Sequence, residues 1–71
     1  MVKVKLKKDK IVAHLAKKNL SQNWLANKLE MSSAYISQLL NGKRMPSPEM
    51  RKRFLNYFEH LTFDELFEIL E

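Results

Sequence analysis

The residues with the most evident chemistry are short side chains between positions 33 and 38. Four of them share one face if this segment is helical, since positions four apart lie above one another: Ser33, Ala34, Ser37 and Gln38. They are polar or methyl-bearing and uncharged, so they can hydrogen-bond to, or pack against, the edges of nucleic-acid bases. A helix that presents such a face fits the major groove of double-stranded DNA.

Catalytic and metal-binding patterns are absent from the sequence. There is no cysteine, which excludes disulfides, thiolate metal sites and cysteine nucleophiles. His14 and His60 are isolated in the sequence and show no ligand-like spacing to acids, which argues against a metal site. No nucleophile–base pair or phosphate loop occurs, so we expect neither an enzyme nor a cofactor.

The net charge of +5 is unevenly distributed along the chain. Residues 1–53 contain all 13 Lys and Arg against three acids, whereas residues 54–71 contain five acids and no Lys or Arg. The basic part favours a polyanionic partner, and the acidic end is expected to face away from it. No apolar run is long enough to span a membrane and no signal peptide is evident, so we expect a cytoplasmic protein without a membrane partner.

The elements that must position these residues are predicted to be five helices in a single domain, residues 1–71. Each prediction combines an N-cap residue with an apolar stripe at helical spacing, over residues 9–18, 22–29, 33–40, 48–61 and 62–70. The expected N-caps are Asp9, Ser21, Ser32, Ser47 and Thr62, the last within a capping box completed by Glu65. Asn19 and Gly42 are expected to end two helices in the left-handed conformation.

Two helices carry further expectations about packing. In the first, Ile11, Val12, Leu15 and Ala16 are predicted to form one apolar stripe. In the last, Leu66 and Phe67 are predicted to close the core of the monomer.

Residues 1–8 form a basic segment that precedes the first helix. Val2, Val4 and Leu6 alternate with lysines, which is the period of a short strand. No second strand pattern is evident. The segment is therefore expected either to pair with its copy in another subunit or to be a mobile basic arm, and we favour the arm.

Three motifs follow one another between residues 21 and 47. They are Ser21-Gln22-x-x-Leu25-Ala26, Ile36-Ser37 and Asn41-Gly42-Lys43-Arg44-x-Pro46-Ser47. Together they resemble the phage repressor and Cro-type helix-turn-helix family, also called the Xre family, and the resemblance extends over residues 9–69. It implies an all-α, compact, five-helix, lambda-repressor-like fold with the helix-turn-helix at residues 21–41. One departure is Glu30, at a turn position usually occupied by glycine, where a left-handed residue would cost about 1 kcal/mol.

The resemblance implies double-stranded DNA as the partner and suggests roles by position. Gln38 is the main candidate for base reading, because a glutamine amide can pair with adenine, and Ser33, Ala34 and Ser37 share its face. Phosphate contacts are expected from residues within or next to the helices predicted over 22–29 and 33–40. These residues are Gln22, Asn23, Ser32, Tyr35, Asn41, Lys43 and Arg44.

The resemblance also implies a transcriptional regulator, which we expect to be a repressor that binds a palindromic operator as a homodimer. The candidate dimer residues are Phe63, Ile69 and Leu70, the apolar positions of the last helix that the core does not require. The alternative is an antitoxin or adaptor module that binds a regulatory protein partner through its C-terminal helix, residues 62–70.

Overall fold

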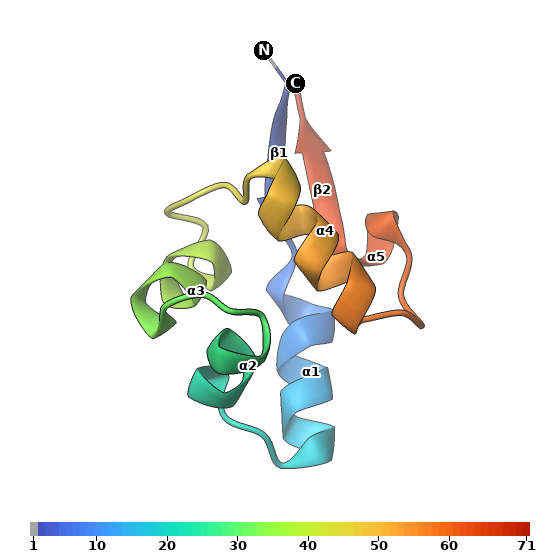
Figure 1. Ribbon diagram of the computed structural model, residues 1–71. Coiled ribbons are helices and arrows are strands. Elements are labelled where there is room, and N and C mark those ends of the chain that lie inside the picture. The colour runs from blue at the N-terminus through green and yellow to red at the C-terminus, as the bar shows by residue number, and fades with distance from the viewer. Residues whose placement is uncertain (1) are drawn as a thin grey trace.

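The computed structural model describes residues 2–71, which contain five helices and two short strands (Figure 1). Their order is β1 (Lys3–Leu6), α1 (Lys8–Lys18), α2 (Gln22–Lys28), α3 (Ser33–Leu40), α4 (Pro48–Tyr57), α5 (Phe63–Leu66) and β2 (Phe67–Leu70). Figure 1 shows α2 and α3 on one side of α1, with α5 on the other. The prediction of five helices is confirmed, but the fold is not all-α, because it also contains a two-stranded sheet. None of the helices described in residues 2–71 has both the length and the apolar character needed to cross a bilayer.

Four of the five predicted N-caps are confirmed. The hydroxyls of Ser21, Ser32, Ser47 and Thr62 each accept a hydrogen bond from the backbone N–H three residues later, at 2.9 to 3.3 Å. The prediction for Asp9 is wrong, because α1 begins one residue earlier and Lys7 occupies the cap without a side-chain hydrogen bond. Asp9 lies instead in the first turn, where its charge is favourable to the helix dipole.

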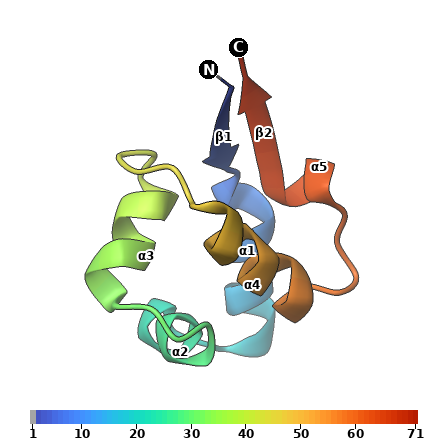
Figure 2. The ribbon, with the colours of Figure 1, turned by 45° about the horizontal axis from the view of Figure 1, so that its top comes forward.

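The largest departure from expectation is at the C-terminus. The helix predicted over residues 62–70 ends at Leu66, and the chain continues as β2, which pairs antiparallel with β1. Leu6 pairs with Phe67 and Val4 with Ile69, so the N-terminal segment is neither a mobile arm nor a strand without a partner in its own chain. A nine-residue apolar pattern is too short to distinguish a helix from a strand, and the partner strand is distant in sequence. Figure 2 shows the paired strands projecting beyond the helices.

The core lies where the helices meet the base of this sheet. Leu66 and Phe67 are buried, which confirms that they close the core. The ring of Phe67 meets that of Phe54 edge-on at 6.3 Å between centroids. The predicted apolar stripe of α1 is narrower than expected, since Ile11 and Leu15 are buried whereas Val12 is 50% exposed and Ala16 is exposed.

Candidate nucleic-acid interface

The helix pair α2 and α3 packs through a small set of apolar side chains. Those of Leu25, Ala26, Leu29, Ile36 and Leu39 are buried. The outer face of α3 is left free of this packing: Ser33 and Ala34 are exposed, and Ser37 and Gln38 are half-buried. The four predicted base-facing residues therefore lie together on the outward side of α3, which stands at the edge of the molecule (Figure 1).

The turn between α2 and α3 contains Glu30 in the left-handed conformation, with φ of 57°. Two backbone hydrogen bonds close the end of α2: Met31 N–H donates to the Ala26 carbonyl at 2.9 Å, and Glu30 N–H donates to the Asn27 carbonyl at 3.2 Å. This is the Schellman arrangement, whose left-handed residue is usually glycine. The left-handed conformation of Glu30 explains why glycine, which has no Cβ, is favoured at this position.

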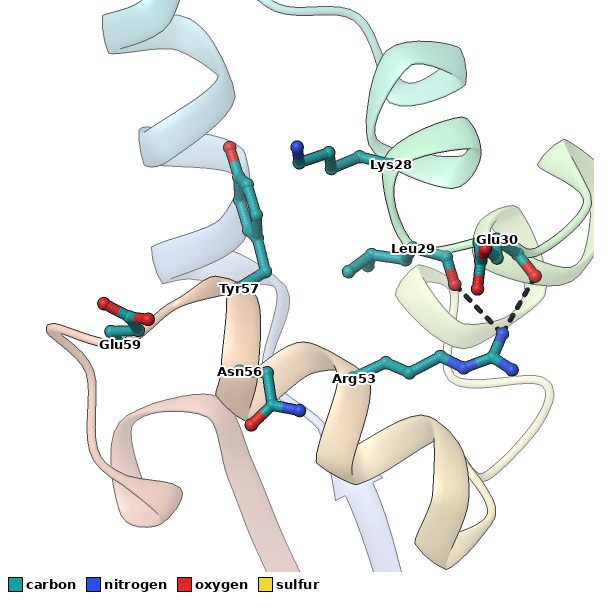
Figure 3. Close-up of a pocket in the computed structure, with 7 residues that line it drawn as sticks. All are labelled: Lys28, Leu29, Glu30, Arg53, Asn56, Tyr57 and Glu59. Carbon is teal, nitrogen blue, oxygen red and sulfur yellow. Dashed lines mark hydrogen bonds between the residues drawn. The ribbon is translucent and has the colours of Figure 1, made fainter.

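Arg53 of α4 stabilises the same turn from outside. Its Nη1 donates to the carbonyl oxygens of Leu29 at 3.1 Å and Glu30 at 2.9 Å (Figure 3). Hydrogen bonds from a charged donor contribute about 1.5–3 kcal/mol, which offsets a left-handed residue that costs on the order of 1 kcal/mol. Sequence reasoning missed this role, because Arg53 lies more than twenty residues from the turn and belongs to no local motif.

We expect the change Glu30→Gly to stabilise the protein by about 1 kcal/mol, because glycine adopts the left-handed conformation without a Cβ clash. Urea unfolding followed by circular dichroism would measure the change in the free energy of unfolding. Glu30→Ala is the matched control, since it removes the carboxylate but keeps the strained Cβ. An equal gain in stability for alanine would contradict the strain argument.

The loop after α3 joins three of the predicted DNA-facing side chains. Arg44 Nε donates to Gln38 Oε1 at 2.9 Å, and the Arg44 guanidinium lies 5.5 Å from the centroid of the Tyr35 ring. A second Schellman arrangement, with Gly42 at φ of 77°, directs the chain back toward α3. Arg44 thus limits the rotamers of Gln38 and leaves the Gln38 amide NH₂ available to donate.

Lys5 of β1 also reaches this loop, although the sequence did not identify it as a candidate. Its Cε and Nζ lie 3.3 and 3.7 Å from the place that a Cβ on Gly42 would occupy. The pairing of β1 with β2 brings Lys5 here, and no local pattern could have indicated it. Lys43 and Arg44 therefore share their region of the surface with a third cation.

The remaining predicted residues lie at separate places. Gln22 and Asn23 are exposed in the first turn of α2, and Asn41 is exposed at the end of α3. The hydroxyl oxygen of Ser32 accepts from Tyr35 N–H as the N-cap of α3, which leaves its hydrogen free to donate. Of the predicted dimer residues, Ile69 is 54% exposed, whereas Phe63 and Leu70 are half-buried.

Comparison with known proteins agrees with this geometry. Residues 13–66, well over half of the chain, match the family model described as Helix-turn-helix. The chain belongs to the Cro/C1-type helix-turn-helix family. This confirms the resemblance predicted from the motifs. Members of this family are not typically enzymes. Because the chain belongs to the family, it is a DNA-binding transcription regulator.

One curated relative of this helix-turn-helix protein comes from Bacillus subtilis (strain 168). It is YvzC, described as an uncharacterized HTH-type transcriptional regulator, and it is 32% identical over 65 residues. These residues make up 92% of the present chain and 83% of YvzC. No solved structure matches the chain.

Proposed function

We propose that this helix-turn-helix protein is a repressor that binds a palindromic operator as a homodimer, with residues 1–71 forming one lambda-repressor-like domain. The observation that carries the proposal is the outer face of α3, which has no packing role and presents Gln38 held by Arg44. In the proposed complex α3 lies in the major groove, and the helix-turn-helix of residues 21–41 sets its angle.

Base reading in this proposal depends chiefly on Gln38. Its amide can donate to adenine N7 and accept from the N6 amino group, a pairing that discriminates by about 1–3 kcal/mol. Ala34 offers a methyl group for contact with thymine, and Ser33 can donate or accept. Ser37 is small enough to let the helix sit deep in the groove. Because one side chain carries the bidentate contact, DNA shape is expected to add to the selectivity.

Phosphate contacts in this proposal come from both ends of the helix pair. The contributing residues are Gln22, Asn23, Ser32, Tyr35, Asn41, Lys43 and Arg44, and we add Lys5 from its position beside Gly42. Such contacts position the protein on the duplex and give a salt-dependent affinity that does not depend on sequence.

The change Lys43→Ala is expected to weaken binding to every duplex alike and to lower the slope of log K against log salt by about 0.9. Fluorescence anisotropy over a series of salt concentrations would measure this slope. Lys52→Ala is the control, because it removes an exposed lysine of α4 outside the proposed contact set. An unchanged slope for Lys43→Ala, or the same change for Lys52→Ala, would count against the phosphate role.

The proposed dimer uses Phe63, Ile69 and Leu70. Its support is exposed Ile69, which lies opposite Val4 on the sheet face that continues outward from buried Leu6 and Phe67. Leu70 pairs with Lys3 and lies on the opposite face of the sheet, so this support does not extend to it. A symmetric dimer would place two copies of α3 about 34 Å apart, one turn of DNA. The antitoxin or adaptor alternative has less support, because the C-terminal helix on which it depended has only four residues.

Sedimentation at high micromolar concentration tests this dimer. We expect the wild-type protein to sediment as a dimer and Ile69→Asp as a monomer, because a carboxylate would be buried without a partner. Val12→Asp is the matched control, an equally exposed apolar residue on α1. A wild-type monomer that also fails to dimerise on DNA would exclude the proposed assembly.

A further inference from the structure

A basic hollow of about 710 Å³ lies between α1 and the segment that follows α4. Its polar lining comes from Lys10, His14, Lys17 and Lys18 of one face of α1, and from Tyr57 and His60. Figures 1 and 2 both show the segment after α4 on the far side of α1 from α3. The hollow therefore lies away from α3, the proposed base-reading helix.

The two histidines of this hollow are neighbours in space, although they are isolated in the sequence. Their ring centroids are 6.0 Å apart. His14 is half-buried, its Nε2 lies 3.0 Å from the Tyr57 hydroxyl, and its ring packs edge-on against Phe58. These contacts hold the His14 ring and the Tyr57 hydroxyl in a defined orientation at the wall of the hollow.

Positive charge at this hollow is only partly balanced. Glu65 of α5 has an Oε2 atom 3.9 Å from Lys10 Nζ. The hydrogen bond from the Thr62 backbone N–H lowers the pKa of Glu65 and keeps it ionised. Within residues 2–71, Lys17 and Lys18 have no carboxylate within ion-pair distance.

Partial burial is the main cause that lowers the pKa of His14. The nearby positive charges of His60 and Lys18 lower it further. An anion in the hollow would oppose the effect of those charges and favour the protonated ring.

We propose that this hollow binds a small phosphate-bearing ligand, with Lys17 and Lys18 supplying charge and His14, His60 and Tyr57 supplying hydrogen bonds. Ammonium groups suit phosphate as point charges, and the volume falls in the range of small-molecule sites. The concave shape and the distance from α3 favour a small ligand over a second duplex. The site would give this regulator an effector that acts away from its DNA-binding helix.

NMR of the two histidine rings tests this proposal, with pyrophosphate added at constant ionic strength. We expect saturable shifts of both His14 and His60, and roughly tenfold or greater weakening in the double variant Lys17→Gln/Lys18→Gln. The control Lys3→Gln/Lys52→Gln makes the same charge change outside the hollow and should bind as the wild type does. Equal weakening in both variants, or shifts that chloride reproduces, would show general charge screening and overturn the proposal.

Two further measurements sharpen this test. Sulfate stays doubly charged between about pH 6 and 8, and we expect it to bind roughly threefold or more tightly at the lower pH, because a bound anion favours the protonated ring of His14, whose pKa is lowered in the free protein. Pyrophosphate binding that shows no saturation, while short duplex DNA shifts both histidines, would identify a nucleic-acid contact and overturn the small-ligand site.

Discussion

Replacing Phe67 by alanine is expected to lower the free energy of unfolding by about 3–5 kcal/mol. The side chain is 1% exposed and lies between the rings of Phe54 and Phe63, at 6.3 and 5.0 Å between centroids. Its strand partner is Leu6, which is also buried. Domains of this size have a total stability of about 0.05–0.15 kcal/mol per residue, so this one change would remove much of it.

Urea unfolding, followed by circular dichroism, measures this loss. Val12→Ala is the control, because Val12 is half exposed on α1 and its truncation should change stability by no more than about 0.5 kcal/mol. A loss below about 1 kcal/mol for Phe67→Ala would mean that the β1–β2 sheet does not cover a packed core as described.

Replacing Gln38 by alanine is expected to weaken binding to the preferred DNA site by about 1–3 kcal/mol, which is roughly 5- to 150-fold. The affinity for unrelated duplex DNA should change little, because the lost contact is to a base edge and not to phosphate. The bond from Arg44 to Gln38 adds a second expectation, that the effects of Gln38→Ala and Arg44→Ala are not additive.

Fluorescence anisotropy on the preferred and an unrelated duplex separates these effects. Gln22→Ala is a useful comparison, since a phosphate contact at the start of α2 should affect both duplexes equally. If Gln38→Ala weakens both duplexes to the same degree, Gln38 does not read bases.

The local features of this fold were predictable from sequence because they depend on neighbouring residues. Ser21, Ser32, Ser47 and Thr62 cap their helices through hydrogen bonds that span three residues. Asn19 and Gly42 adopt the left-handed backbone conformation where their helices end, and this too depends on neighbouring residues. These caps fix the boundaries of α2 and α3, and so the face that α3 leaves exposed.

Apart from the Asp9 cap and the width of the α1 stripe, the features that were missed depend on contacts between distant segments. β2 forms because Val4 and Leu6 offer a partner strand some sixty residues away, whereas the apolar spacing after Thr62 suits a helix equally well. Arg53 reaches the Glu30 turn from α4, and Lys5 reaches Gly42 from β1. His14 and His60 also become neighbours through tertiary packing. Spacing along the chain carries no signal for such pairs.

Selection of bound sites from random duplex DNA, at a stated salt concentration, would test sequence-specific binding by a dimer through α3. We expect a palindromic consensus whose half-sites lie about one helical turn apart. Salt-sensitive binding that enriches no consensus would contradict it, because only general affinity for the phosphate backbone would then remain.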